Sequence, residues 1–277
     1  MLKHYHSLIP STIDTYIEPF FGGGAMFLYV VKNRNPSKLI INDINPDIVN
    51  IYQAIRDDLS EFSANIDALE AKYIPMSKED RKKYYFEVRH EHAYDYVQWS
   101  KPREAATLYF LMKTGFNGIF QINKNTNGRF GTPSGLLNQV DVVYDREVVR
   151  YWHEVLQRAE IKAGNWSDAI PPSLTDDTFV FLDPPYRGSF TTYGQEFGDD
   201  RQSEVLDFAK KTSANVFLCN RDVEGDPFFK DGILGTDLQI AYFDITYTAG
   251  RRKKVDDGFE AKKAIEILVY RVNDFLR

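Results

Sequence analysis

The feature that most constrains the fold is a glycine-rich turn, Glu18-Pro-Phe-Phe-Gly-Gly-Gly24, which lies between a strand pattern and a helix pattern. Residues 15–18 precede it as a short apolar strand, and residues 25–31 follow it with helical character. A second β-rich run over residues 38–42 ends at Asp43, and a helix is predicted to begin at 45–47. Strand, glycine-rich turn, helix, strand and terminal acid are typical of the opening of a nucleotide-binding α/β sheet. We therefore predict a Rossmann-like α/β fold.

Composition excludes several other classes. The chain has 277 residues, of which 43% are hydrophobic and 27% charged, as expected for a globular protein of one or two domains. The first ten residues contain no apolar signal core, and no apolar run approaches a membrane span of about 18 residues, so we expect a cytoplasmic protein without a membrane anchor. The single Cys219 excludes an internal disulfide framework and a cysteine-rich zinc site, and no other metal motif is found.

Net charge gives no global indication of a polyanionic partner, because it is −6. Two basic islands nevertheless interrupt the acidic sequence. Residues 101–131 contain five basic and one acidic side chain, and residues 250–263 contain six basic and three acidic ones. Such islands are compatible with nucleic acid but do not establish it, and taken alone they favour an ordinary solvated surface.

The glycine-rich turn and Asp43 together suggest a nucleoside-containing cofactor. Glycines allow the backbone to approach a ligand closely, and the following helix N-terminus favours polar or anionic groups. Asp43 lies 21 residues after Gly22 at the end of the next predicted strand, where an acid commonly accepts hydrogen bonds from ribose hydroxyls. The chain has no P-loop motif, which argues against a phosphate-gripping NTPase.

A second motif, Asp183-Pro-Pro-Tyr186, directly follows the strongly apolar run 178–182. Consecutive prolines remove backbone donors and stiffen the chain, so Asp183 and Tyr186 are expected in a rigid corner at the carboxyl edge of the sheet. A carboxylate and a carbonyl there can accept both hydrogens of a planar amino group while an aromatic ring stacks on the base. The simpler interpretation is a proline-rich turn with a capping Asp.

The sequence between these motifs changes character. Charged helical patterns occupy residues 59–98, a further helix is expected at 105–112, and a turn-rich segment at 116–130 predicts a β-hairpin. Strand–helix alternation returns after Tyr144, with predicted strands at 160–162, 178–182, 215–219 and a final pair, 238–247 and 264–272. We predict a catalytic domain over 1–55 and 145–277 and a mainly helical insert over 56–144 that carries the hairpin.

EPFFGGG, IINDINPD and LDPPY, with the insert between the last two, resemble the Dam-type DNA adenine-N6 methyltransferases (D12 class, alpha group). The resemblance extends to residues 114–123, 130–135, 190–193 and 218–220, and so covers nearly the whole chain. It implies a methyltransferase sheet with an inserted DNA-recognition domain. It also implies S-adenosyl-L-methionine as methyl donor and double-stranded DNA as substrate, with adenine flipped out of the duplex.

The resemblance also assigns site residues. Those expected to bind the cofactor are Glu18, Phe20, Gly22, Gly23, Gly24, Asp43, Asn165, Trp166 and Asp183. Those expected at the reacting amine are Asp183, Pro184, Pro185 and Tyr186, in a direct transfer without a covalent enzyme intermediate. Those expected to contact DNA are Phe116, Asn117, Ile119, Gln121, Arg129, Pro133, Tyr193, Arg251 and Arg252. No metal is implied.

Two departures from the family pattern bear on function. Members specific for GATC typically carry Arg where this chain has Gln121, and Gln pairs with adenine whereas Arg prefers guanine, so a GATC site and a relaxed or altered site remain alternatives. The family usually opens with a KWxGGK-like segment, whereas this sequence begins at a stretch that resembles the helix after it. Reduced cofactor affinity and a true start upstream are the alternatives.

The sequence supports three function hypotheses. The first is a DNA adenine-N6 methyltransferase, monomeric or weakly dimeric, acting as an orphan of phage type or beside a cognate restriction nuclease. The second is a DNA cytosine-N4 methyltransferase, because the Asp183 corner presents similar groups to either base. The third is a non-catalytic DNA-binding regulator that has lost cofactor binding.

Overall fold

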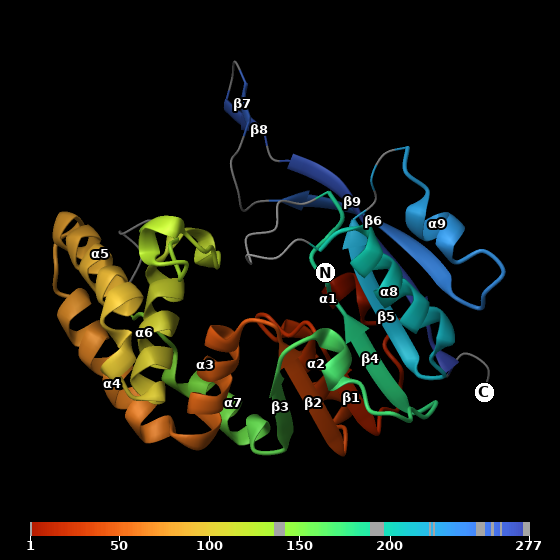
Figure 1. Cartoon of the computed structure of the whole chain (residues 1–277), viewed down its shortest axis with the longest axis horizontal. Coiled ribbons are helices and arrows are strands. Elements are labelled where there is room, and N and C mark those ends of the chain that lie inside the picture. The colour runs from red at the N-terminus through yellow and green to blue at the C-terminus, as the bar shows by residue number, and fades with distance from the viewer. Residues whose placement is uncertain are drawn as a thin grey trace. The chain divides into compact units, whose positions relative to one another are not determined.

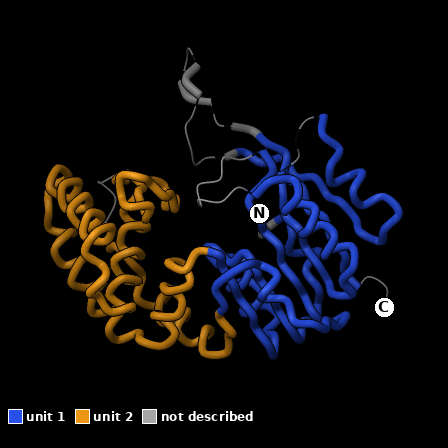
Figure 2. The backbone as a smooth tube through the Cα atoms, viewed as in Figure 1, with its two compact units in different colours: residues 1–44, 162–191, 196–277 blue, residues 45–161, 192–195 orange. Residues whose placement is uncertain are grey.

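The structure is a computed structural model that describes residues 2–135, 142–188, 197–221, 223, 225–247, 253–255, 258–260 and 262–273. The chain divides into two compact units, which are coloured separately in Figure 2. Unit 1 comprises Met1–Ile44, Lys162–Thr191 and Glu196–Arg277, and unit 2 comprises Asn45–Ile161 and Thr192–Gln195. Each unit is described by itself.

Unit 1 is built around a seven-stranded sheet with the strand order β3-β2-β1-β4-β5-β9-β6 (Figure 1). Its strands are β1 (Thr15–Glu18), β2 (Lys38–Asp43), β3 (Ala159–Ala163), β4 (Thr178–Leu182), β5 (Asn215–Arg221), β6 (Gln239–Tyr247) and β9 (Lys262–Arg271). Its helices are α1 (Leu2–Tyr5), α2 (Ala25–Arg34), η4 (Trp166–Ala169), α8 (Asp199–Lys211) and α9 (Phe228–Gly232). A separate two-stranded ribbon pairs β7 (Lys253–Val255) with β8 (Gly258–Glu260).

The strand pattern read from the sequence is confirmed. Strands β1, β2, β4 and β5 are parallel neighbours, whereas β9 pairs antiparallel with β5 on one side and with β6 on the other. The fully buried β4 reads as a continuous apolar run because a central parallel strand is covered on both faces. The mixed α/β fold expected from the sequence is therefore present.

Packing on the two faces of this sheet uses different side chains. On one face, Ile17, Val180, Leu182, Val216 and Leu218 pack with residues of η4, α8 and α9 in one buried cluster. On the other face, aromatic rings dominate. Tyr16 contacts Phe27 of α2 and Phe179, and Tyr5 of α1 contacts Phe217. Burial of both faces holds the carboxyl ends of the parallel strands rigidly at one edge.

Unit 2 is mainly helical. Its elements are α3 (Pro46–Asp57), α4 (Leu59–Tyr73), α5 (Lys78–Tyr94), η1 (Tyr96–Gln98), α6 (Lys101–Thr114), η2 (Phe116–Gly118), η3 (Lys124–Thr126) and α7 (Arg146–Leu156). The apolar helix α6 packs against α3, α4 and α5, and α3 also packs against α7. The unit therefore takes in α3 and α7 as well as the 56–144 segment expected to form the insert.

The segment predicted as a β-hairpin is instead a loop with two isolated antiparallel bridges, Gly115↔Ser134 and Ile122↔Phe130. No strand forms between residues 116 and 130, all of which the structure describes. The backbone turns into the left-handed region at Asn117 (φ 55°) and Gly118 (φ 63°), and again at Asn127 and Gly128. These turns interrupt the extended backbone that a strand ladder needs, so the turn-rich segment forms isolated bridges in place of the predicted hairpin.

Candidate active site

Three acidic residues from unit 1 gather at the carboxyl edge of the sheet. Glu18 ends β1, Asp43 ends β2, and Asp183 directly follows β4. Since β1 pairs in parallel with both β2 and β4, the three strand ends lie next to one another. The charges of Asp183 and Asp43 both raise the pKa of Glu18, after the larger effect of its burial, as expected for neighbouring carboxyls. The sequence prediction of a shared edge is supported by this geometry.

The glycine-rich turn is fastened to Asp43. The Gly22 amide donates to Asp43 Oδ2 at 2.8 Å, while Gly22 adopts φ +48°, which favours glycine. A Cβ added at Gly22 or Gly23 would meet no atom within 4 Å, so this part of the turn borders open space rather than protein. The turn can therefore admit a ligand close to its backbone.

Asn42 joins the loops that follow three strands, and the sequence did not predict this residue as part of the site. Its Nδ2 donates to the carbonyl of Pro19 after β1 at 3.0 Å and to that of Gly164 after β3 at 3.1 Å. The Gly164 amide in turn donates to the Asp43 carbonyl after β2 at 3.1 Å. The signal for it was an Asn at the end of an otherwise apolar strand, a buried polar group that must find partners.

Aromatic side chains flank the same edge. Phe20 lies nearly parallel to Trp166, with ring centroids 6.1 Å apart, and contacts Phe197 edge-on at 5.7 Å. Trp166 is buried, and its indole Nε1 has no hydrogen-bond partner among the described residues. Asn165 is exposed, and its backbone N–H donates to Asp168 Oδ2 at 3.1 Å. The partly exposed Phe20 can receive a planar ring, while the buried Trp166 stacks against Phe20, and Phe197 is a further aromatic residue of this edge that the sequence did not predict.

Glu18 itself faces the protein interior. It is 2% exposed, and its Oε2 accepts a 2.7 Å hydrogen bond from the Tyr16 hydroxyl. Burial raises the pKa of Glu18 well above its usual range, although the Tyr16 hydrogen bond opposes this, so the neutral carboxyl is favoured. This arrangement gives Glu18 a role in holding the turn, and nothing in it supports direct contact with a ligand.

Asp183 keeps access to solvent, yet the surrounding protein removes much of its hydration. Burial raises its pKa to about 6, a hydrogen bond with Tyr186 acts in the opposite direction, and the charge of Glu266 adds to the increase. Tyr186 is half-buried, and burial raises its pKa as well, so the phenol stays neutral. The corner therefore presents a carboxyl that is ionised at neutral pH beside a neutral aromatic ring.

Five of the residues expected to contact DNA share one loop of unit 2 and are exposed there: Phe116, Asn117, Ile119, Gln121 and Pro133. The loop is anchored to its own unit. Buried Phe120 and Phe130 pack at 5.5 Å, and Tyr85 of α5 donates its hydroxyl to the Thr132 carbonyl at 2.9 Å. A rigid base with exposed tips suits a surface that reads a partner.

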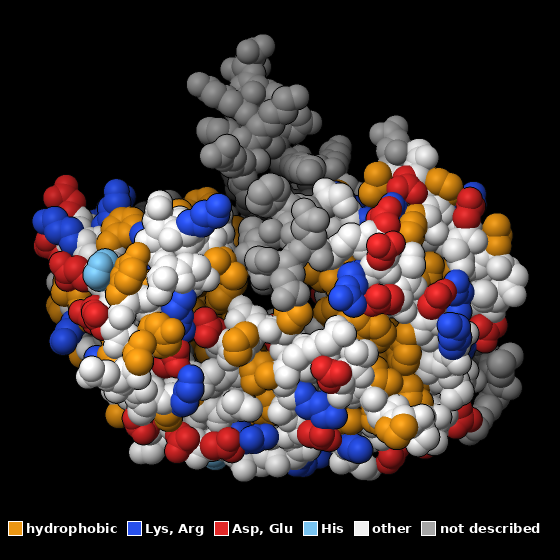
Figure 3. Space-filling view, viewed as in Figure 1, with side chains coloured by type: hydrophobic (Ala, Val, Ile, Leu, Met, Phe, Trp, Pro, Cys, Tyr) orange, Lys and Arg blue, Asp and Glu red, His pale blue; other side chains and the backbone are white. Residues whose placement is uncertain are grey.

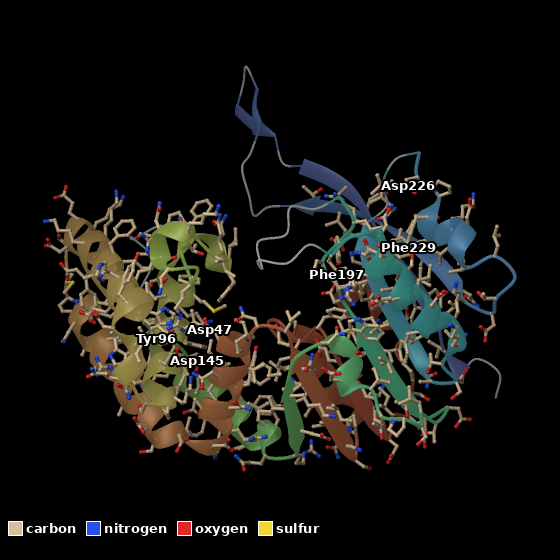
Figure 4. The ribbon with its side chains drawn as sticks, viewed as in Figure 1. Asp47, Tyr96, Asp145, Phe197, Asp226 and Phe229 are labelled. Carbon is tan, nitrogen blue, oxygen red and sulfur yellow. The ribbon has the colours of Figure 1, made fainter. Side chains whose placement is uncertain are left out.

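Arg129, expected beside them, is engaged inside unit 2. Its guanidinium donates to Glu104 Oε1 and to Asp47 Oδ1, the latter at 3.1 Å, and it lies 3.6 Å from the centre of the Tyr96 ring. Asp47 and Tyr96 are labelled next to each other in Figure 4. A DNA contact would require this network to open, so the geometry gives Arg129 a structural role.

The remaining expected DNA contacts, Tyr193, Arg251 and Arg252, lie outside the described residues. On the face shown in Figure 3, acidic and basic side chains of the described residues are interspersed over each unit. No helix in the described ranges is long and apolar enough to cross a membrane. In the same ranges, no group of three or more His, Cys, Asp or Glu side chains is arranged to hold a metal ion.

The fold and this site define an α/β enzyme whose polar and aromatic groups meet at the carboxyl edge of a mixed sheet. The family model for D12 class N6 adenine-specific DNA methyltransferases matches residues 1–247. The chain belongs to this family, and it is an adenine-specific DNA methyltransferase.

Individual relatives agree. A type II methyltransferase of Methanocaldococcus jannaschii is 29% identical over 75% of this chain and 74% of its own length. A type II methyltransferase of Paramecium bursaria Chlorella virus NC1A is 30% identical over 87% of this chain and 86% of its own. A DNA adenine methylase of Vibrio cholerae is 28% identical over 74% of this chain and 72% of its own.

Proposed function

We propose that the protein binds S-adenosyl-L-methionine at the carboxyl edge of the unit 1 sheet and uses Asp183 to present a flipped adenine to it. The observation that carries this proposal is the open Gly22–Gly23 backbone fastened to Asp43, beside the corner that holds Asp183 and Tyr186. Bound there, the cofactor would supply an electrophilic methyl group, and its neutral demethylated form would be the leaving group.

The residues present fit this cofactor. Asp43 would accept from the ribose hydroxyls while its Oδ2 holds the Gly22 amide, and Phe20, Trp166 and the exposed Asn165 would flank the adenine. Gly22 and Gly23 border the methionine part without side chains that would obstruct it, and the buried Gly24 is proposed beside them from the sequence. Glu18 contributes by supporting the turn from inside the protein.

The chain's own groups prepare the amine. The Asp183 carboxylate and the Pro184 carbonyl accept its two hydrogens, and Tyr186 stacks on the base. An exocyclic amine is a poor nucleophile because its lone pair is delocalised into the ring. Accepting its hydrogens favours a pyramidal nitrogen and stabilises the positive charge that develops during attack. After the methyl group has moved, the nitrogen would lose one proton to the Asp183 carboxylate, which is exposed and can pass it to solvent.

DNA recognition is proposed for the loop of unit 2 that exposes Phe116, Asn117, Ile119, Gln121 and Pro133. Gln121 can bond bidentately to adenine, so the proposal favours an altered or relaxed site over strict GATC. Tyr193, Arg251 and Arg252 are proposed as further DNA contacts from the sequence alone. A monomer or weak dimer remains the expectation from the sequence, and the type II names of two relatives support the proposal of a cognate nuclease.

The test is Asp183→Ala, assayed by transfer of a labelled methyl group to DNA and by mass spectrometry of the nucleosides. We expect a fall in turnover of at least about 100-fold, the usual effect of removing one group that stabilises transition-state charge. Asp200→Ala is the matched control, because Asp200 is an exposed acid on α8, and it should leave turnover unchanged.

Three results would contradict the proposal. Retained turnover in Asp183→Ala would remove the carboxylate from its assigned role. Calorimetric titration with S-adenosyl-L-methionine and with its demethylated product would overturn the cofactor site if neither bound. Recovery of N4-methylcytosine in place of N6-methyladenine would point to a different target base.

A further inference from the structure

Two fully buried amide side chains lie behind the corner that carries Asp183. Gln202 is in the first turn of α8, Asn220 is near the end of β5, and both are 0% exposed. Gln202 Nε2 donates to the Pro185 carbonyl at 2.7 Å, and Asn220 Nδ2 donates to Gln202 Oε1 at 3.0 Å. Asn220 Oδ1 accepts from the Arg187 amide at 2.9 Å. The two amides thus form one continuous chain of hydrogen bonds that holds the corner on either side of Tyr186, at Pro185 and at Arg187.

The corner needs such support because of its composition. Pro184 and Pro185 have no backbone N–H, so neither can anchor the segment by donating to a neighbour. The segment can therefore be anchored in two ways: a proline carbonyl accepts a hydrogen bond, or a residue outside the prolines donates one. Gln202 supplies the first kind of anchor at Pro185, and Asn220 supplies the second at Arg187.

A third anchor continues beyond the prolines. Arg221 Nη2 donates to the Arg187 carbonyl at 3.1 Å, and the Arg187 guanidinium pairs with Asp199 and Asp226, each at 2.8 Å. Asp226 is labelled in Figure 4. The anchoring bonds fall on Pro185 and Arg187. Among the described residues, none of these anchors uses the Pro184 carbonyl. That carbonyl is the acceptor proposed for the amine.

We propose that Gln202 and Asn220 are positioning residues for methyl transfer, which hold the Asp183 corner at the geometry that the target amine requires. This inference rests on the proposed function of Asp183. Both side chains are too buried to touch substrate, so they act through Pro185 and Arg187. Misplacement of a reacting group by about 1 Å can cost about 100-fold in rate, which sets the scale of the expected effect.

The experiment compares Gln202→Met and Gln202→Glu with the full-length wild type in single-turnover methyl transfer. Met keeps the approximate shape of Gln and removes both hydrogen bonds. Glu keeps the acceptor for Asn220, and at pH 9, where the assay is run so that this buried carboxyl is ionised, it replaces the donor to Pro185 with an oxygen that repels that carbonyl. We expect the transfer rate to fall about 10- to 100-fold in both variants, while the Kd values for S-adenosyl-L-methionine and for DNA change less than about threefold.

Asn215→Ala is the matched control for a purely structural effect. Asn215 is a buried amide at the other end of β5, where it donates to the carbonyls of Asp176 and Thr178 and accepts from the Asn273 amide. Its loss removes a comparable set of hydrogen bonds far along the strand from the corner. It should lower Tm without lowering the transfer rate at temperatures well below Tm.

The outcomes separate the inference from the proposed function. An inactive wild type would refute the proposed site itself. If the wild type is active and both Gln202 variants transfer methyl groups at its rate, the positioning role alone is overturned. The same holds if the Gln202 variants lose no more rate than Asn215→Ala does, or if their losses arise only from weaker DNA binding. If Gln202→Met does not fold, the comparison of Gln202→Glu with Asn215→Ala decides.

Discussion

At the scale of single residues, Asp183 must balance two requirements. It needs to be ionised to accept hydrogens from an amine, and it must sit in a site poor enough in water for that interaction to be strong. Burial raises its pKa to about 6, which still leaves it ionised at neutral pH. The residue therefore combines a desolvated environment with the charge that the proposed reaction needs.

The pH dependence of the transfer step follows from this value. Below pH 6 the Asp183 carboxyl becomes protonated and loses acceptor capacity, so the single-turnover rate should fall by about tenfold for each further pH unit. The measurement is rapid quench at saturating cofactor and DNA between pH 5 and pH 9. A rate that stays level down to pH 5 would contradict ionised Asp183 as the acceptor.

Stability should respond in the opposite sense, which provides a check independent of activity. The folded-state pKa of Asp183 is raised above its unfolded value of about 3.9, so its contribution to stability is full below about pH 4 and is lost as pH rises through about 6. Asp183→Asn keeps the group neutral. It should therefore raise Tm at pH 8 and leave it nearly unchanged at pH 4.

At the scale of elements, the unit 2 loop of residues 115–135 shows how two polar residues of one segment acquire different roles. Gln121 is exposed at the tip, whereas the Arg129 side chain is only 10% exposed and lies beside Glu104, itself 7% exposed. Burial alone would raise the pKa of Glu104, but hydrogen bonds from Lys101 and Arg129 lower it, so the acid remains charged. The loop thus depends on a buried ion pair at its base.

We expect Arg129→Met and Gln121→Arg to separate stability from recognition. Arg129→Met removes one of the two cations that pair with Glu104 and leaves Lys101 as the other, so it should lower the free energy of unfolding by about 1–3 kcal/mol. Gln121→Arg should leave stability within about 0.5 kcal/mol but shift site preference toward guanine by about 1–3 kcal/mol. Denaturant titration and methylation of a randomised DNA library measure the two effects.

The converse result would reassign these residues. If Arg129→Met left stability intact but weakened DNA binding, the guanidinium would be a DNA contact after all. If Gln121→Arg left the sequence profile unchanged, Gln121 would be removed from the residues that read the bases.

At the scale of the whole molecule, the proposed work is divided between the two units. Every residue proposed to hold the cofactor lies in unit 1, whereas the exposed loop proposed to read DNA lies in unit 2. Ligand binding stabilises the structure that it contacts, by about 2.7 kcal/mol at a ligand concentration of 100 times Kd. The two ligands should therefore protect different parts of the chain.

Hydrogen exchange can test this division. S-adenosyl-L-methionine alone should slow exchange at 20–24, 42–44, 164–168 and 183–187, and should leave the amides of α4 to α6 nearly unchanged. A specific DNA duplex should add protection at 115–135. Protection by the cofactor that is confined to unit 2 would contradict the proposed site.

Much of this protein can be predicted from its sequence because the informative signals are local. Alternation of apolar runs with turns indicated the parallel strands, and the motifs at Gly22, Asp43 and Asp183 each follow a strand, so their shared edge is a consequence of parallel topology. The family resemblance rests on the order of the same motifs. Local chemistry and strand direction were sufficient for these conclusions.

Other features were decided only by the tertiary structure, because they depend on residues that are far apart in the chain. The burial of Glu18 and Arg129, the left-handed turns that replace a hairpin, and the packing of α3 and α7 into unit 2 all depend on what lies opposite each segment. The bond from Gln202 to Pro185 joins residues 17 positions apart. Residue type states which hydrogen bonds an amide can make, but only the folded chain determines which partner it meets.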